Sequence, residues 1–296
     1  MSLKSFNILF IIPRMSSVYT LNHGDAEKER QRLDFQHGVF KAIMRDDLPP
    51  IIWKHLKTIP VPKVADADTG TGIFLKELAP QLPKDAQLDG FDIDTRKFPD
   101  PASLPENVKL RFGNVLKPFP KQYLGTYDLV HVKLLYAALR KDEWLLAVKN
   151  LKTLLKPDGY LFWSEIGAYG YASNPYSAAF HEWKSIESAA AVKFGRDPKC
   201  PVLLPRQFQE AGLERVDEKV FVTLGRPDLI PIITRMALEY MAQNLHGLLL
   251  LDKDGSLGLS DAKVKSLVET VTKETESGVE LGTNLHWVWG QNNGSS

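Results

Sequence analysis

Between residues 63 and 164 the chain alternates short apolar segments with helical ones, and no other feature restricts its fold as strongly. We expect a helix that follows the first strand and runs through Ala79, and another over residues 144–155 that Pro157 ends. We expect strands over residues 64–67, 87–93, 108–112, 129–132 and 160–164. Strands that alternate with helices at this spacing form a mostly parallel, doubly wound sheet. Such a sheet binds ligands at the carboxyl ends of its strands.

Further helices and two more strands are predicted on either side of this core. Apolar side chains recur at helical spacing over residues 25–45, and a shorter helix is expected over residues 51–56. The later elements are expected to be helices over 177–194, 229–244 and 260–275 and strands over 215–222 and 284–289. The predicted fold class is therefore α/β, with a Rossmann-like sheet of seven strands, a helical N-terminal region and a helical lid.

We expect five parts along the chain. They are an N-terminal helical arm or cap (1–60), the ligand-binding core (61–166), a lid insertion (167–206), the C-terminal part of the core (207–290) and a disordered tail (291–296).

Charge and cysteine content exclude several classes of protein. The chain of 296 residues has 37 Lys and Arg against 36 Asp and Glu, a formal net charge of +1, so we expect no nucleic-acid partner. The one cysteine, Cys200, is interpreted as a packed thiol rather than a nucleophile. The apolar run over residues 6–13 is too short to cross a bilayer. We expect a soluble, cytoplasmic protein without a membrane partner, whose apolar arm packs on the domain or joins a homodimer.

The glycine turn after the first strand carries the informative chemistry. Residues 64–75 read VADADTGTGIFL, so a strand leads through glycines into a helix and places backbone N–H groups around a ligand. Twenty residues after Gly72 the next strand ends in Asp92, a position suited to accept hydrogen bonds from ribose hydroxyls. Asp66 and Asp68 would repel a pyrophosphate but suit a ligand with an ammonium and a sulfonium. These charges indicate S-adenosylmethionine.

Seven ordered segments resemble the class I S-adenosylmethionine-dependent methyltransferases, and more closely their LaeA-like branch in fungal secondary metabolism. Besides the glycine loop they are ERQRLDFQH from residue 29, LDGFDI from 88, LPENV from 104, YDLVHVK from 127, LLKPDGYL from 154 and WVWGQ from 287. The resemblance covers about residues 19–166 in the family's order, and WVWGQ resembles its closing strand.

This resemblance implies a role for each cofactor residue. Asp66 would orient the methionine ammonium, while Gly70 and Gly72 would let the backbone approach the cofactor. Asp92 would hold the ribose, and Ile93 beside it is a further expected contact. The other implied positions are Asn114 and Val115 by the adenine, Tyr19 and Arg32 closing over the methionine end, and Lys133 after the fourth strand, where the family usually has arginine.

Asp68 stands where the family's loop has its first glycine. A carboxylate at this position either points at the ligand, where it would help to hold the ammonium and repel the methionine carboxylate, or turns toward solvent. The first interpretation predicts weakened or lost cofactor binding, and the second predicts ordinary binding. Loss of this glycine would also be expected in a family member that kept the fold but catalysed a cyclisation without methyl transfer.

Candidates for substrate chemistry follow the fourth and fifth strands. Glu165 and Lys133 are predicted to face the pocket, although Glu165 would also suit an ion pair with Lys133 or Arg32. His181 is the candidate base of the lid, unless it is solvated on an exposed helix face. His131 is interpreted as a hydrogen-bonded core group. No metal is expected, because the histidines and carboxylates lack ligand spacing.

The predicted lid is rich in aromatic side chains. Within 22 positions the sequence places Phe162, Trp163, Tyr169, Tyr171, Tyr176, Phe180 and Trp183, of which we expect about half to be core and the rest to wall a pocket for an apolar or aromatic small molecule. The leading interpretation is a small-molecule methyltransferase acting on O, N or C. A non-methylating cyclase or pericyclase and a non-catalytic regulatory binder are the alternatives.

Overall fold

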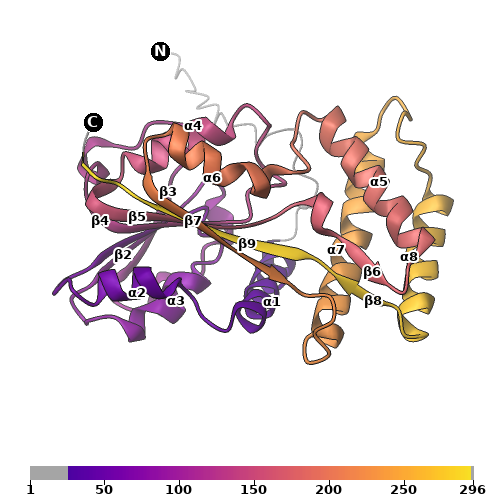
Figure 1. Cartoon of the computed structure of the whole chain (residues 1–296), viewed down its shortest axis with the longest axis horizontal. Coiled ribbons are helices and arrows are strands. Elements are labelled where there is room, and N and C mark those ends of the chain that lie inside the picture. The colour runs from indigo at the N-terminus through magenta and orange to yellow at the C-terminus, as the bar shows by residue number, and fades with distance from the viewer. Residues whose placement is uncertain (1–25, 295–296) are drawn as a thin grey trace, which may run out of the picture.

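The computed structural model of the chain describes residues 26–294 (Figure 1). Within them, seven strands form one sheet in the order β3–β2–β1–β4–β5–β9–β7. Along the chain these are β1 (Lys63–Ala67), β2 (Gln87–Asp92), β3 (Val108–Phe112), β4 (Tyr127–Lys133), β5 (Leu155–Ile166), β7 (Glu214–Val222) and β9 (Asn284–Gln291). The first five pair in parallel, and β9 runs antiparallel to β5 and β7. The predicted seven-stranded, mostly parallel sheet is confirmed.

The order of the strands reverses beside β1, near the middle of the sheet. From β1 the chain adds β2 and β3 on one side, and then returns to add β4 on the other. In register, Asp66 of β1 lies between Gly90 of β2 and His131 of β4. Connections that leave in opposite directions open a crevice at the carboxyl ends of the strands, where ligands bind in such sheets.

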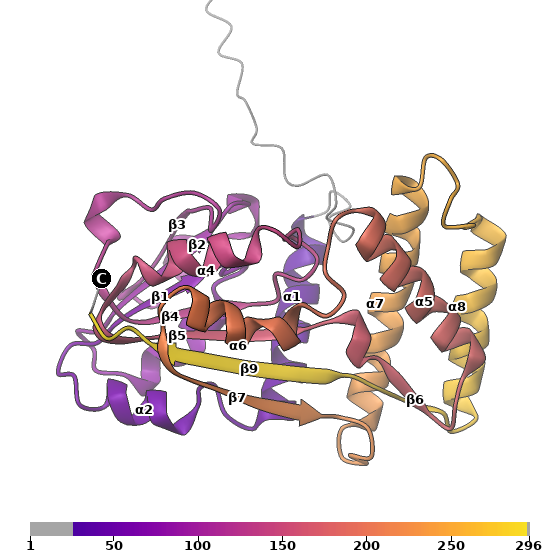
Figure 2. The ribbon, with the colours of Figure 1, turned by 45° about the horizontal axis from the view of Figure 1, so that its top comes forward.

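Helices cover both faces of the sheet, so its strands are apolar on both sides. Val64 packs with α2 (Pro50–Leu56) and α3 (Ile73–Leu78), whereas its neighbour Ala65 belongs to the core shared with α4 (Trp144–Lys152) and α6 (Cys200–Glu210). Figures 1 and 2 show α2 on one side of the sheet and α4 and α6 on the other.

A separate group of helices stands beyond the carboxyl ends of the strands (Figures 1 and 2). It consists of α5 (Ala178–Lys193), α7 (Ile230–Leu251) and α8 (Asp261–Glu276), which contact one another. A two-stranded ribbon of β6 (Ala172–Asn174) and β8 (Glu280–Gly282) ties the segment before α5 to the segment after α8.

The predicted limits of the lid are wrong in two respects. The range 167–206 includes the start of α6, but α6 packs on β7, β9 and α4 and so covers the main sheet. Conversely, α7 and α8 lie in the range predicted as core, yet they pack on α5. The apolar faces of α7 and α8 pack against α5, which lies far from them in the sequence. Hydrophobic periodicity shows that a helix has an apolar face but not which helix covers it.

The first helix, α1 (Ala26–Met44), lies across the carboxyl end of the sheet. Its buried residues Val39, Phe40 and Ile43 form a cluster with Ile166 at the end of β5 and Ile233 of α7. This packing places the polar face of α1 over the crevice. No helix in residues 26–294 is both long and apolar enough to cross a membrane. Residues 6–13 and Tyr19 fall outside the described part, so the dimer contact stays a prediction.

Two predicted boundaries also need correction. The helix α4 ends at Lys152 and β5 begins at Leu155, so Pro157 lies in the strand instead of ending the helix. The tail was predicted from residue 291, but β9 continues through Gln291, and Asn292 N–H donates to the Gly159 carbonyl at 2.8 Å. The backbone pairing of β5 therefore extends into the segment expected to be disordered.

Candidate active site

A cavity of about 800 Å³ opens at the carboxyl ends of β1, β2, β4 and β5, at the reversal of strand order. Its volume is within the range of pockets that enclose small molecules. The helix α1 and Tyr240 of α7 contribute to its wall. The predicted residues that line it are Arg32, Asp66, Asp68, Gly70, Asp92, Ile93, Asn114, Val115, Lys133 and Glu165. Residues from six separate segments are thus brought into one cavity.

Asp66 is the buried residue before the last position of β1, and it is held on both carboxylate oxygens. The Thr69 hydroxyl donates to Oδ2 at 2.6 Å, and His131 Nδ1–H donates to Oδ1 at 2.6 Å. Because the carboxylate accepts from Nδ1, we assign the hydrogen to that nitrogen. His131 is buried and stacks on Phe74 at 3.9 Å between ring centroids. It orients Asp66, so its interpretation as a hydrogen-bonded core group is confirmed.

Asp92 ends β2 and fixes the glycine turn. Its Oδ2 accepts from Gly70 N–H at 2.8 Å, and its Oδ1 accepts from Asp94 N–H at 2.8 Å. Burial raises the pKa of Asp92, against the opposing effects of the Lys97 ammonium and these backbone donors. Lys97 Nζ also donates to Oδ1 at 3.5 Å, so Oδ2 is the oxygen that keeps a lone pair for a further donor, such as a ribose hydroxyl.

Asp68 lies in the cavity wall with a left-handed backbone, φ +65°. Aspartate tolerates this conformation better than most residues, which explains how it replaces a glycine. Burial, and next the Asp92 carboxylate, raise the pKa of Asp68 to about 8. The structure favours the first sequence interpretation, in which the side chain faces the ligand, but it adds that the group is an uncharged acid at neutral pH.

Gly72 does not line the cavity, contrary to prediction. It precedes α3 with φ +76°, and a Cβ there would lie 3.0 Å from the Leu110 side chain. The close approach in this region is instead made by Gly90 of β2, where a Cβ would lie 2.5 Å from Leu110 and 2.8 Å from the Thr69 hydroxyl. Gly90 therefore makes room for the Thr69 that holds Asp66.

The opposite ends of the cofactor region are formed by Arg32 and Asn114. Two guanidinium nitrogens of Arg32 donate to the Glu29 carboxylate at 2.8 and 2.7 Å, which fixes its position on α1. Asn114 Oδ1 accepts from Leu116 N–H at 2.9 Å, so the side-chain amide nitrogen of Asn114 points away from Leu116 N–H. Tyr19 lies outside the described residues.

Lys133 ends β4 and connects the cavity to α1. Its Nζ donates to His37 Nδ1 at 2.8 Å. Burial lowers the pKa of Lys133 to about 8, although four carboxylates around it act in the opposite direction. An amine with this pKa has both protonation states available near neutral pH, as a group that accepts a proton requires.

Glu165, near the end of β5, is fully buried and lines the cavity. It accepts from Leu135 N–H at 2.7 Å, from Trp163 Nε1–H at 3.0 Å and from Ile166 N–H at 3.0 Å. These donors tie the ends of β4 and β5 together and replace the ion pair considered for it with Lys133 or Arg32. Burial raises the pKa of Glu165 to about 7.

His181 and most of the aromatic set do not reach the cavity. His181 on α5 stacks on Tyr176 at 4.4 Å, its Nδ1 contacts the Ser177 carbonyl at 2.8 Å, and it does not line the cavity, so its part as a lid base gains no support and stays a prediction. Phe162, Trp163, Tyr171, Phe180 and Trp183 are buried in the core, and Tyr176 is exposed. The aromatic residues that do line the cavity are Phe74, Tyr136 and Tyr240. Cys200 is buried, as a packed thiol should be.

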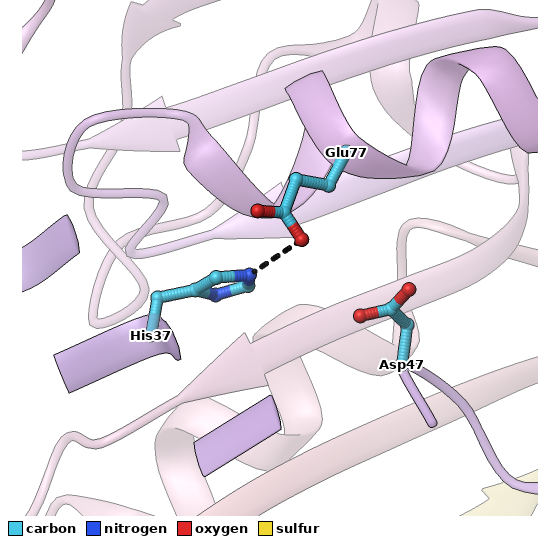
Figure 3. A group of neighbouring side chains, drawn as sticks. All are labelled: His37, Asp47 and Glu77. Carbon is cyan, nitrogen blue, oxygen red and sulfur yellow. Dashed lines mark hydrogen bonds and ion pairs between the residues drawn. The ribbon is translucent and has the colours of Figure 1, made fainter. Parts of the chain in front are cut away.

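A second polar cluster lies behind Lys133. His37, Asp47 and Glu77 bring candidate metal-ligand atoms within 4.8 Å of one another (Figure 3). However, the Lys41 ammonium lies 2.5 Å from Glu77 and 3.3 Å from Asp47, so a cation already neutralises both carboxylates. A metal ion would have to displace it. We therefore assign the cluster to a charge network, which the sequence could not reveal because its members lie on separate segments.

Among the polar residues of the cavity wall that the sequence did not identify are Gln36, Thr69, Asp94 and Tyr240. Thr69 and Asp94 stand within the two loops already recognised, so their place in the chain could have suggested them. Gln36 and Tyr240 come from α1 and α7, and only the packing of these helices brings them to the site.

The residues present fit S-adenosylmethionine. The loop of Asp66 offers a buried carboxylate to an ammonium, and Asp92 Oδ2 retains an acceptor for a ribose hydroxyl. Gly70, which donates its N–H to Asp92, lines the cavity without a side chain. A ligand with cationic groups at one end and vicinal hydroxyls in the middle matches this order of donors and acceptors.

Comparison with known proteins agrees with this geometry. Residues 36–218 match a family model described as a methyltransferase domain. The chain is 34% identical to the methyltransferase grgD of Penicillium sp., over 70% of this chain and 73% of that protein. It is 30% identical to the N-methyltransferase tcpN of Claviceps purpurea, over 66% of this chain and 69% of that one, and 28% identical to the N-methyltransferase gliN of Aspergillus fumigatus, over 79% and 81%. The chain therefore belongs to the methyltransferase-domain family, as a class I S-adenosylmethionine-dependent methyltransferase.

Proposed function

We propose that this enzyme methylates a nitrogen atom of a small molecule in fungal secondary metabolism. The observation that carries the proposal is the placing of two titratable groups, Lys133 and Glu165, in the same cavity as the cofactor residues. Methylation of an N–H group requires that a proton be removed, and both groups have pKa values near neutral. The similarity to tcpN and gliN, which are named N-methyltransferases, supports nitrogen over oxygen or carbon.

In this proposal the β1 and β2 loops hold the cofactor. Asp66 binds the methionine ammonium, Asp92 binds the ribose, and Ile93, Asn114 and Val115 contact the adenine side of the site. When bound, S-adenosylmethionine supplies an electrophilic methyl group on a sulfonium. The tight hydrogen bonds of Asp66 to Thr69 and His131 keep its carboxylate oriented before the ligand enters, which reduces the entropy lost on binding.

Lys133 is the proposed proton acceptor. Lys133 lines the cavity, and the hydrogen bond to His37 fixes the direction of its Nζ. The unprotonated amine takes the proton of the substrate nitrogen as that nitrogen becomes bonded to the methyl carbon. Glu165 is anchored by three donors, so its proposed part is to hold the wall of the substrate region and to accept a hydrogen bond from the substrate.

The substrate region lies over the ends of β4 and β5. Its wall includes Leu33, Leu134, Leu135, Ile166 and Tyr240, which are apolar or amphipathic. We propose a substrate with an apolar body and one nitrogen nucleophile. Most of the aromatic residues from which the sequence predicted an apolar substrate are buried in the core. The proposal of an apolar substrate therefore depends on other residues than those predicted. The cytoplasmic location stays a prediction.

Asp68 is proposed to leave cofactor binding intact at neutral pH. As an uncharged acid it does not repel the methionine carboxylate, and its hydroxyl can donate a hydrogen bond to it. The weakening expected from an ionised Asp68 would then appear only above about pH 8. Nothing in the described residues favours the cyclase or regulatory alternatives.

Transfer of isotopically labelled methyl from S-adenosylmethionine tests the proposed function. Purified enzyme is incubated with panels of secondary amines and amides, phenols and activated carbon acids, each with an apolar body, and with fungal extract fractions. We expect labelled products among the nitrogen compounds, and none with Asp92→Ala. Labelling confined to oxygen or carbon would contradict the choice of nitrogen, and no labelling in any panel or extract would contradict methyl transfer.

A further inference from the structure

A continuous chain of hydrogen bonds runs from the cavity wall to the surface through α1 and α3. Lys133 Nζ lies 2.8 Å from His37 Nδ1, His37 Nε2 lies 3.3 Å from Glu77 Oε2, and Lys41 Nζ lies 2.5 Å from the same oxygen. Figure 3 shows the imidazole of His37 pointing at Glu77. His37 is buried, whereas the side chain of Glu77 is 35% exposed. The inner end of this chain is in the cavity, and the outer end contacts water.

The partners of His37 define its tautomer. Lys133 offers only hydrogens, so Nδ1 accepts, and the Glu77 carboxylate offers only lone pairs, so Nε2 carries the hydrogen. Burial, followed by the nearby Lys133 charge, lowers the pKa of His37 to about 4, which keeps the ring neutral. A neutral imidazole with one accepting and one donating nitrogen can pass a proton from one side to the other.

We propose that His37 and Glu77 form a proton path that carries the proton released by methyl transfer from Lys133 to solvent. The inference rests on the proposed function of Lys133. As the substrate nitrogen attacks the methyl carbon, the C–S bond pair stays on sulfur and the N–H proton passes to the Lys133 amine. Lys133 gives one proton to His37 Nδ1, while His37 Nε2 gives its own to Glu77. Glu77 then releases a proton to water. The imidazole regains its first tautomer when Nδ1 loses its proton to a water and Nε2 takes one from water, for which the small cavity beside His37 has room.

On the side of the protein interior, the surroundings of Lys133 offer few other exits for a proton. Carboxylates act on it from α1, from the loop after α1, from β1 and from α3: Asp34, Asp47, Asp66 and Glu77. Asp66 is already held by Thr69 and His131, and both of these are buried. A cavity of about 10 Å³ between His37, Lys41, Asp47 and Lys133 is close to the volume that one water needs. Apart from the cavity itself, the route through His37 and Glu77 thus reaches solvent with continuous partners among the described residues.

Glu77→Gln breaks the path, and Asp47→Asn is its matched control. Both variants remove one negative charge near Lys133 and one partner of Lys41, but Asp47 is not between Lys133 and solvent. Both should lower the pKa of Lys133, measured by the pH dependence of its acylation in the enzyme bound to S-adenosylhomocysteine. Only Glu77→Gln should slow turnover, on the order of tenfold, with recovery by small buffer acids and bases. Equal rates in the two variants would overturn the path.

Nitrogen NMR of His37 tests the chain of hydrogen bonds without any turnover. In the wild type and in Glu77→Gln, each bound to S-adenosylhomocysteine, we expect a neutral ring with hydrogen on Nε2 at pH 7, because Lys133 donates to Nδ1 in both. Hydrogen on Nδ1, or a charged ring at pH 7, would overturn the path even if methyl transfer is found. Absence of methyl transfer with the expected tautomer would instead overturn the proposed function, and with it the step that loads the path.

Discussion

Replacement of Asp68 changes a buried carboxyl group and a left-handed backbone position together. The folded protein keeps the Asp68 proton up to about pH 8, whereas the unfolded chain releases it near pH 3.8. Between these values folding retains a proton that unfolding releases, so the free energy of unfolding decreases by up to ~1.4 kcal/mol per pH unit. The contribution is fully present below pH 4 and is lost as the pH rises toward 8.

The size of this loss at pH 7 follows from the structure. The full interval from 3.8 to 7 would give on the order of 4 kcal/mol. Because Asp68 keeps partial contact with solvent, water screens part of the effect, and we expect about 2 to 4 kcal/mol. The left-handed backbone at Asp68 destabilises the folded protein by about 1 kcal/mol more, a cost that glycine does not have.

Asp68→Asn and Asp68→Gly separate these two contributions. Asn removes the charge and keeps a side chain that tolerates positive φ, whereas Gly also removes the backbone strain. At pH 7 Asp68→Asn should be more stable than the wild type by about 2 to 4 kcal/mol, and this advantage should disappear near pH 4. Asp68→Gly should gain about 1 kcal/mol more at both pH values, because the relief of backbone strain does not depend on pH.

Urea unfolding between pH 4.5 and 8.5 measures this difference. The change in midpoint at constant m-value gives the difference in stability, and the other titrating groups cancel between wild type and variant. A difference that stays constant over this range would refute the reasoning, because it would mean that Asp68 has an ordinary pKa in the folded protein.

Three further substitutions test separate parts of the site. Lys133→Arg keeps a positive charge that does not titrate, so kcat should fall about 100-fold and lose its rise toward pH 8; a retained pH profile would contradict the role of Lys133. His181→Ala should leave kcat/KM unchanged, since His181 lies outside the cavity, and a large loss would support it as a lid base. Gly90→Ala should destabilise the fold by about 1–3 kcal/mol, because the added Cβ would meet the side chains of Leu110 and Thr69. The same variant should bind the cofactor more weakly in calorimetry. Unchanged stability and binding would show that these two side chains move freely.

The sequence predicted the sheet and the cofactor loops well because both depend on local patterns. Apolar segments at regular spacing indicate strands, and an acidic residue beside a glycine turn indicates a ligand loop. Asp66 and Asp92 were identified in this way, and the structure brings them into one cavity. The early start of β5 at Leu155 was not predicted, because a proline such as Pro157 usually marks the end of a helix.

The substrate side was harder to predict because it depends on tertiary packing. Tyr171 and Trp183 had the composition of a pocket wall, but α7 and α8 bury them against α5. Tyr240 of α7 follows Ile166 by 74 positions, yet both residues line the cavity. No sequence pattern predicts that residues so far apart lie together. The protonation state of Asp68 likewise depends on burial and on Asp92, not on its place in the loop.

Calorimetric titration of S-adenosylmethionine and S-adenosylhomocysteine into the wild type and Asp92→Ala tests the central claim most directly. We expect one site per chain for both ligands at pH 7. Loss of the hydrogen bonds from the ribose to a charged acceptor should weaken binding in Asp92→Ala by about 1.5–3 kcal/mol, or tenfold and more. No binding by the wild type at millimolar ligand, or equal binding by wild type and Asp92→Ala, would contradict the assignment of this cavity to the cofactor.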